Sequence, residues 1–190
     1  MNNQFHIQIL QAIFLFCIYL SQKRVCPTLS CLGGNMAKLK IVKFGDPMLR
    51  KVARPVDQIT PRIITLLDDM IETMRDAGGC GLAAPQVGVL RRIAVIEVED
   101  GNVIELINPK IIAFAGEQTE QEGCLSNPGE YGITKRPAAV TVRATNRHGE
   151  EFEVTGNDLL ARAICHECDH LDGKLYVDVQ IQALTEKDFK

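Results

Sequence analysis

Two histidines and a glutamate are spaced in this sequence so that they could serve one metal ion. His166, Glu167 and His170 form an H-E-x-x-H pattern within residues 166–170. Residues four apart on a helix project from the same face, so both imidazoles can reach one ion. Glu167, about 100° round the helix from His166, can reach a water molecule on that ion. The pattern predicts a metal-assisted hydrolase; a chance pair of surface histidines is the alternative.

A catalytic metal site usually has three protein ligands and one open position, so a third ligand must come from elsewhere. Cys168 lies about 200° round the helix from His166, and Cys165 lies about 120° from the mean direction of the two histidines. We therefore expect both cysteines to be small packing residues of the core or its flank. Cys124, within the segment Glu-Gly-Cys-Leu-Ser, is the remaining candidate in the second half of the chain. A cysteine in such surroundings is more often simple packing, so residue types alone leave its role open.

The segment that carries the two histidines is expected to be a helix. Asn157 or Asp158 is placed to cap it, and the helix should run from about Leu159 to Leu171. Gly173 then closes it. The histidines would thus lie near the end of a helix with apolar flanks.

Other elements must hold this helix in place. A long helix is expected after Thr60-Pro61, because apolar residues recur at spacings of three and four until Gly78-Gly79. Asp46-Pro47 should open a short helix to Val52. Apolar runs at 93–98 and 103–107 flank Asp100-Gly101 and predict a hairpin. Further strands are expected at 111–114, 139–145 and 151–154.

This order of elements favours one fold class. Strands grouped between helices, with hairpin-length links, predict an α+β domain with mixed, mainly antiparallel sheets around a central helix that carries the histidines. The 190 residues are 46% hydrophobic, which is ordinary for one domain with a real core. The formal charge is -3, with no dense basic run, so we expect no direct nucleic-acid binding. Seven irregularly spaced cysteines indicate a reducing compartment rather than a disulfide framework.

The first 35 residues differ from the rest. They contain no acidic residue and two basic ones, whereas residues 36–190 carry 19 basic against 24 acidic residues. Their most apolar part, residues 7–20, is 14 residues long, shorter than the roughly 20 of a membrane span. A basic region before it, as in a signal peptide, is absent. We expect residues 1–35 to be an extension that is disordered, processed or upstream of the true start at Met36, and residues 36–190 to be the catalytic domain.

A third segment reads Gly79-Cys80-Gly81-Leu82-Ala83-Ala84-Pro85-Gln86. Its closely spaced glycines and alanines allow the backbone to come close to another backbone segment or to a ligand. Taken in order, the motifs G-x-G-L-A-A-P-Q, E-G-C-L-S and H-E-x-D-H-L-x-G resemble the peptide deformylase family. The resemblance covers about residues 36–178, including the opening Lys-Phe-Gly-Asp-Pro at 43–47. It implies a peptide deformylase fold and removal of the formyl group from N-formylmethionine of newly made polypeptides.

The resemblance also implies the cofactor and partners. Cys124, His166 and His170 would bind one ion, typically Fe²⁺, with Zn²⁺, Ni²⁺ or Co²⁺ as possible substitutes. One thiolate and two imidazoles by themselves suit iron or zinc. The expected partners are N-formylmethionyl peptides and, transiently, nascent chains at the ribosome, without nucleic-acid or membrane binding. The expected location is the cytoplasm.

Catalytic roles follow from the same resemblance. Glu167 would take a proton from the attacking water and return it to the leaving amine. The side-chain amide of Gln86 and the backbone N–H of Leu125 would stabilise the oxyanion together with the metal. Asp169, with Arg136 as its partner, would orient the ligand helix, and a solvent-exposed carboxylate is the alternative for Asp169.

Substrate-binding residues are predicted on two segments. Going back along the helix from His166 reaches Ala163 and Leu159, which with Cys80 would line the methionine pocket, although each is equally compatible with ordinary packing. Gly79 and Gly81 would expose backbone to an extended peptide. Cys80 replaces an aliphatic residue common in the family and is expected to make the site more sensitive to oxidation.

Two other classes of protein compete with this interpretation. A zinc endopeptidase shares H-E-x-x-H but would bring a third His or Glu ligand and an open cleft. A structural metal module would need a fourth protein ligand, for which the sequence offers no well-placed residue.

Overall fold

The computed structural model describes residues 37–184 and residue 188. The extension predicted at residues 1–35 lies outside these described residues, and its nature stays a prediction. The described residues belong to one compact unit. No helix of the described residues is long and apolar enough to cross a membrane.

Two antiparallel sheets make up the β-structure of the described residues. The larger has the strand order β1-β2-β3-β6-β7 and the smaller β4-β5-β8. In the larger sheet the strands are β1 Gly81–Ala83, β2 Ile93–Ile96, β3 Ile104–Ala115, β6 Ala139–Thr145 and β7 Glu151–Asn157. In the smaller they are β4 Gln118–Cys124, β5 Asn127–Arg136 and β8 Gln180–Leu184.

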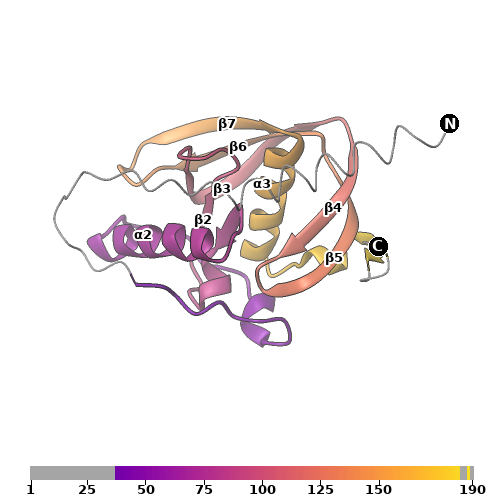
Figure 1. Ribbon diagram of the computed structural model, residues 1–190. Coiled ribbons are helices and arrows are strands. Elements are labelled where there is room, and N and C mark those ends of the chain that lie inside the picture. Colours follow the sequence, from indigo (N-terminus) through magenta and orange to yellow (C-terminus); the bar gives the residue numbers. More distant parts are fainter. Residues whose placement is uncertain (1–36, 185–187, 189–190) are drawn as a thin grey trace. The chain divides into compact units, whose positions relative to one another are not determined.

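Helix α3, Asp158–Leu171, is the central element. It lies between the β4–β5 hairpin and the larger sheet (Figure 1). Its residues Ala161, Ile164 and Leu171 are fully buried in a cluster that includes apolar side chains of β2, β3 and β6. Antiparallel sheets packed around this helix confirm the predicted α+β class.

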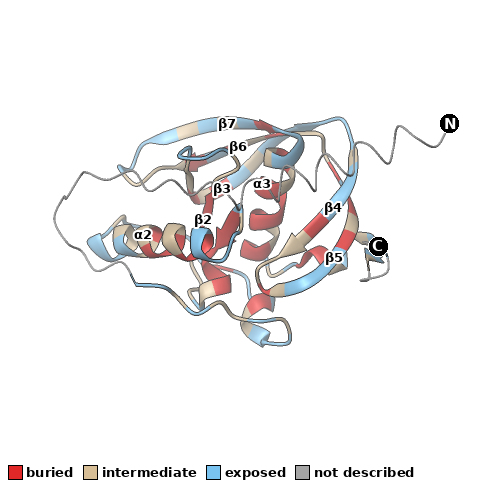
Figure 2. Cartoon of the chain, viewed as in Figure 1, coloured by how far each residue is buried: buried red, intermediate tan, exposed pale blue. Residues whose placement is uncertain are grey.

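Helix α2, Pro61–Asp76, closes the other side of the larger sheet. It follows Thr60 as predicted and buries Leu67, Met70 and Met74 with apolar residues of β1 and β2. Its opposite side is partly exposed (Figure 2): Arg62, Thr65 and Asp76 are exposed there, whereas Asp69 is buried. Three short 3-10 helices complete the fold: η1 Pro47–Arg50, η2 Ala84–Val87 and η3 Tyr176–Asp178.

Several boundaries differ from the sequence-based predictions. The helix expected at 47–52 is a 3-10 turn ending at Arg50, although the Asp46 side chain caps it by accepting from the Met48 amide at 2.8 Å. Residues 104–107 of the first expected segment and residues 111–114 belong to one long strand, β3, whose two register shifts interrupt the apolar pattern. Asn157 is the N-cap residue of α3 but makes no capping hydrogen bond through its side chain.

The first register shift in β3 is fixed by Asn108. Its φ of 53° lies in the left-handed region, which Asn tolerates better than most residues. Its side chain accepts from the Val56 amide and donates to the Val56 carbonyl, both at 2.8 Å. One amide side chain therefore ties the segment before α2 to the larger sheet.

We expect Asn108→Ala to destabilise the fold more than Asn108→Gly. Both variants lose two hydrogen bonds, together worth about 2 kcal/mol, but Ala also resists the positive φ, which adds up to about 1 kcal/mol. Urea unfolding of both variants beside the wild type measures the difference. Equal stability of the two variants would show that the backbone conformation contributes nothing.

Candidate metal centre and catalytic site

Three candidate ligands from two elements converge at the centre of the unit. Cys124 ends β4, while His166 and His170 project from α3. The His170 Nε2 atom lies 3.2 Å from the Cys124 Sγ atom and 3.1 Å from the His166 Nε2 atom. The three candidate ligand atoms all lie within 4.8 Å of one another. The structure thus brings together the three residues that the sequence predicts as metal ligands.

The arrangement of these atoms fits a metal ion. The two histidine rings are buried, and their Nε2 atoms face each other beside the thiol sulfur of Cys124. This arrangement is typical of side chains that bind one metal ion together. The Nδ1 atom of His170 has no hydrogen-bond partner among the described residues. A set of one sulfur and two nitrogens suits iron or zinc rather than a hard cation such as Mg²⁺.

Glu122 fixes the orientation of His166, and the sequence analysis did not single it out. Its Oε1 atom lies 2.6 Å from His166 Nδ1. A carboxylate at this distance holds the ring proton on Nδ1. The Nε2 atom is then unprotonated, and its lone pair is free to bind a metal ion. Side chains two apart on a strand point to the same face, so the spacing of Glu122 and Cys124 is a signal that could have revealed this role.

The Glu122 carboxylate is itself held by β5. Thr134 Oγ1 donates to Glu122 Oε2 at 2.7 Å, and Arg136 donates to both carboxylate oxygens at 3.1 and 2.9 Å. Arg136 Nη1 also donates to Asp169 Oδ2 at 2.6 Å, so the contact expected between Arg136 and Asp169 is present. Burial alone would raise the pKa of Glu122, but the hydrogen bonds from His166 and Arg136 outweigh it and lower this pKa to about 2.

Glu167 is a buried carboxyl group that lacks a full set of partners. It is 3% exposed, and its Oε2 atom has no hydrogen-bond partner among the described residues. A Cβ added to Gly81 would collide with Glu167 Oε1, so the glycine provides the space that the carboxyl group occupies. Burial raises the pKa of Glu167 to about 7. A carboxyl group with this pKa can both accept and return a proton near neutral pH.

Gln86 projects its amide nitrogen toward the same centre. Its Nε2 atom lies 3.4 Å from Cys124 Sγ and 3.3 Å from Ser126 Oγ, and its Oε1 atom accepts from the Ala83 amide at 2.8 Å. The bond to Ala83 fixes which end of the amide faces the site. Leu125 follows Cys124, and its carbonyl accepts from Lys43 Nζ at 2.9 Å.

The other predicted residues occupy the surroundings of this centre to different degrees. Gly79 packs against the Leu125 side chain. Ala163 is 6% exposed, whereas Leu159 is 43% exposed and Cys80 is also exposed. Their contribution to a methionine pocket stays a prediction.

The two cysteines that flank the histidines are packing residues. Cys165 and Cys168 are buried in the cluster around α3. Burial raises the pKa of Cys165 to about 11 and of Cys168 to about 12, so both stay protonated. The prediction that they are core residues is confirmed.

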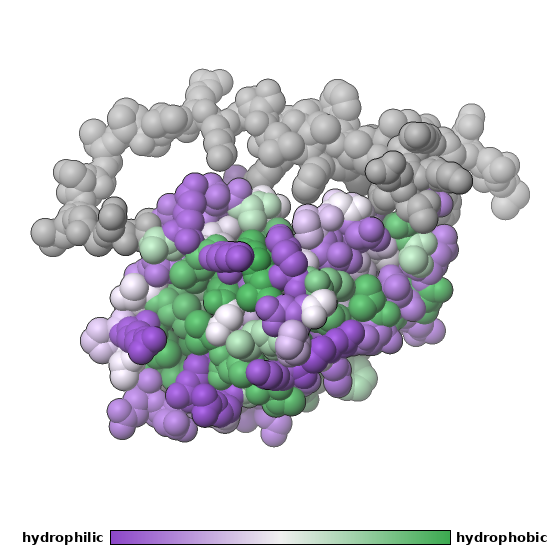
Figure 3. Space-filling view, turned by 90° about the horizontal axis from the view of Figure 1, so that it is seen from below, coloured by the Kyte–Doolittle hydropathy of each residue, from purple (hydrophilic) through white to green (hydrophobic). Residues whose placement is uncertain are grey.

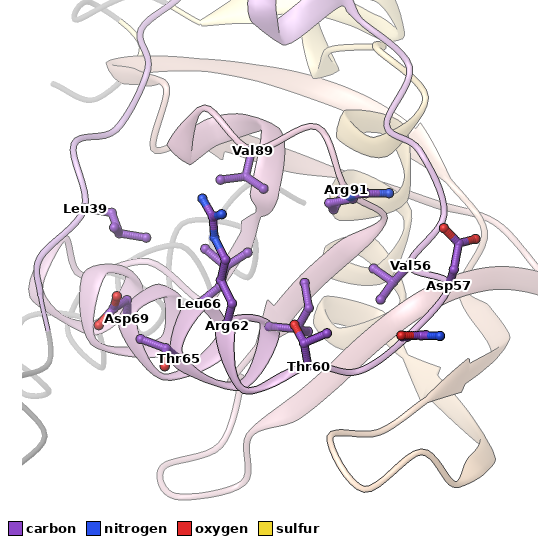
Figure 4. Close-up of a pocket in the computed structure, with 12 residues that line it drawn as sticks. Leu39, Val56, Asp57, Thr60, Arg62, Thr65, Leu66, Asp69, Val89 and Arg91 are labelled. Atoms are coloured by element: carbon purple, nitrogen blue, oxygen red, sulfur yellow. The ribbon is translucent and has the colours of Figure 1, made fainter.

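A large hollow lies apart from the candidate ligands. Its volume is about 1090 Å³, and residues of α2 line it together with others from the segments 39–60 and 89–91 (Figure 4). None of the predicted site residues lines it. Hydrophobic residues also gather in the middle of the face seen in Figure 3, with hydrophilic ones around them.

The fold and the converging side chains are those expected of a metal-dependent hydrolase. The family model described as polypeptide deformylase matches residues 38–186. A peptide deformylase of Lachnoclostridium phytofermentans is 58% identical over 145 residues, which are 75% of this chain and 89% of that protein. The chain belongs to the polypeptide deformylase family.

Solved structures agree with this assignment. A peptide deformylase from Legionella pneumophila has a TM-score of 0.74 and 44% identity, covering 80% of this chain and 89% of its own. A class I type b peptide deformylase from Acinetobacter baumannii, described as Met-Ala-Ser bound, has a TM-score of 0.72 and 31% identity, covering 76% and 99%.

We expect Glu122→Gln to weaken metal binding about 10- to 100-fold, because a neutral amide holds the His166 ring less firmly than a carboxylate does. Competition with a chelator of known affinity, followed with Co²⁺ or Zn²⁺, measures the change. Glu120→Gln, an exposed position on the same strand, is the matched control. Equal affinity of wild type and Glu122→Gln would contradict the role of Glu122.

The same variant tests the acid dependence of stability. The folded-state pKa of Glu122 lies at about 2, below its ordinary value of 4.5, so its ionised contacts stabilise the fold fully above 4.5 and are lost as the pH falls toward 2. We expect the difference in unfolding free energy between metal-free wild type and metal-free Glu122→Gln to shrink over this range. Urea unfolding at several pH values measures it, and a constant difference would contradict the prediction.

Proposed function

We propose that this chain removes the N-formyl group from N-formylmethionine of newly synthesised polypeptides, releasing formate and a free amino terminus. The observation that carries the proposal is the meeting of three metal-binding side chains with the buried carboxyl group of Glu167 and the amide of Gln86. Hydrolysis of an amide needs an activated water, a proton carrier and donors for the oxyanion, and these groups can supply all three.

Cys124, His166 and His170 would hold the ion, and Fe²⁺ is our first choice, with Zn²⁺, Ni²⁺ or Co²⁺ as substitutes. When bound, such an ion lowers the pKa of water and polarises the formyl oxygen. Glu122 would keep His166 in the tautomer that leaves Nε2 free. Arg136 would fix the orientation of helix α3, because it binds both Glu122 on β4 and Asp169 on α3.

Glu167 would move the proton. Its carboxylate accepts a proton from the attacking water as the C–O bond forms at the formyl carbon. It then donates this proton to the nitrogen as the C–N bond breaks, so the leaving group departs as an amine. The raised pKa of about 7 supports both halves of this exchange.

Gln86 and Leu125 would stabilise the oxyanion. The Gln86 Nε2 atom, oriented by the Ala83 amide, and the Leu125 backbone N–H would donate to the formyl oxygen as it gains negative charge. Loss of one such donor typically costs about 3 kcal/mol of transition-state stabilisation.

The substrate would bind as an extended peptide along Gly79 and Gly81, with its methionine side chain near Cys80, Leu159 and Ala163. The Acinetobacter baumannii relative solved with Met-Ala-Ser supports a peptide that begins with methionine. Newly made chains carry such a start, so we infer transient encounters with nascent chains at the ribosome. We also infer a cytoplasmic location, where a thiolate ligand stays reduced.

A zinc endopeptidase is the rival enzyme. It is disfavoured because the third candidate ligand beside the two histidines is Cys124 rather than His or Glu. A structural metal module is disfavoured because the described residues offer a group of three ligands without a fourth.

The decisive test is formate release from a formyl-Met peptide by residues 36–190, purified anaerobically with Fe²⁺. We expect release by the wild type, a loss of at least about 100-fold in Glu167→Ala with the ion retained, and loss of both ion and activity in Cys124→Ala. Casein cleavage is assayed in parallel. A folded, iron-loaded wild type that releases no formate would overturn the proposal, and casein cleavage would favour the endopeptidase.

A further inference from the structure

Tyr176 is a buried side chain beside the candidate ligands that the proposed mechanism does not use. It begins η3, shortly after helix α3 ends, and is 2% exposed. It belongs to neither of the two clusters of buried apolar residues described above for α2 and α3. Its neighbours include Phe44, Asn127 and His166, which come from three separate parts of the chain. The surroundings of the metal centre are therefore joined through one aromatic side chain.

The Tyr176 ring lies against the ring of His166. The two ring centroids are 6.2 Å apart and the ring planes are inclined by 23°, which is a stacked arrangement. Glu122 Oε1 holds the Nδ1 atom of the same imidazole at 2.6 Å. A single bond at one atom still allows the imidazole plane to turn about that bond, whereas an aromatic ring against its face opposes this movement. Glu122 and Tyr176 thus restrain His166 in two different directions.

The Tyr176 hydroxyl group reaches the turn that follows Cys124. Cys124 pairs with Asn127 across the end of the β4–β5 hairpin, and Asn127 Nδ2 donates to the Tyr176 hydroxyl oxygen at 3.2 Å. Burying a hydroxyl group costs free energy unless it is hydrogen-bonded, so this contact accounts for a tyrosine at a buried position. Tyr176 therefore connects the residue opposite Cys124 to the face of His166.

Phe44 supports the same turn from its other side. Its ring centroid lies 6.0 Å from that of Tyr176. Its backbone amide donates to the Ser126 carbonyl at 3.0 Å, within the turn between Cys124 and Asn127. Two adjacent residues of the turn are thus anchored, Ser126 by Phe44 and Asn127 by Tyr176, and the two anchoring rings contact each other.

We propose that Tyr176 is a positioning residue of the metal centre, which holds the turn of Cys124 and the ring of His166 in the relation that lets both reach one ion. This rests on the ligand set of the proposed function. Glu122 joins β4 to His166 two residues before Cys124, and Tyr176 adds a second connection three residues after it, at Asn127. The cysteine therefore lies between two connections to the same histidine.

The alternative role for Tyr176 is to fill space in the fold. Substitution of a packing residue changes the free energy of unfolding, but the folded protein binds the ion as before. Substitution of a positioning residue changes the affinity of the folded protein and the arrangement of its ligands. Co²⁺ reports both properties, because competition with a chelator gives the affinity, and the d–d and thiolate-to-cobalt absorption bands report the geometry.

Three variants of the full-length chain, loaded anaerobically with Co²⁺, test the proposal. Tyr176→Phe and Asn127→Ala remove the hydrogen bond from either side, and each should weaken Co²⁺ binding about 3- to 10-fold. The double variant should be at most about twofold weaker than either single one, because both lose the same bond. Tyr176→Leu also removes the stacked ring, and it should weaken binding about 10- to 100-fold and shift the absorption bands.

Two further variants serve as controls. Phe152→Leu is the matched control, because Phe152 is a partly buried aromatic residue of β7 that packs against the apolar cluster around α3. It should lower the urea midpoint of unfolding but leave the Co²⁺ affinity within about twofold of the wild type. Cys124→Ala measures the Co²⁺ that the other cysteines of the chain bind.

The outcomes separate this inference from the proposed function. A wild type that binds no more Co²⁺ than Cys124→Ala would overturn the proposed metal centre, and this inference with it. A wild type that binds the ion but releases no formate from a formyl-Met peptide would overturn the proposed activity alone. Tyr176 variants that unfold more easily but bind Co²⁺ with the affinity and spectrum of the wild type would overturn the role of Tyr176 alone. If Tyr176→Leu does not fold, Tyr176→Phe and Asn127→Ala decide.

Discussion

The contact between Glu122 and His166 is the interaction on which the site depends. It joins a strand of the smaller sheet to the central helix, and it does so through a carboxylate that Arg136 and Thr134 hold from the next strand. Burying a carboxylate, a guanidinium and an imidazole together costs free energy unless each group has an ion-pair or hydrogen-bond partner. Here every buried charge of the group is paired, so the two layers meet in one orientation, and Cys124 comes to face the histidines.

Much of this architecture could be predicted from the sequence. The periodicity of α2 and α3 and the turn at Asp100-Gly101 are local signals, and the structure has these elements where such signals placed them. The β4–β5 hairpin escaped prediction because its residues are mostly polar or glycine and one face is open to solvent. Its strands are specified by pairing and by Glu122, neither of which is visible as a hydrophobic pattern.

The residues of the candidate site likewise fall into those that local sequence signals predict and those that such signals do not predict. The spacing of His166 and His170 is a local signal, so helical geometry alone predicts that they share an ion. Cys124 is distant in sequence and carries no such signal, and a resemblance to a family was needed to select it among the cysteines.

The placement of the three candidate ligands on two separate elements has a consequence for the folding equilibrium. An unfolded chain does not hold Cys124 near the histidines, so any ion that binds all three donors binds the folded state selectively. By mass action, free ion at about 100 times its dissociation constant adds about 2.7 kcal/mol to the stability of the fold. Metal supply would then set the stability of the fold as well as the fraction of the chain that is active.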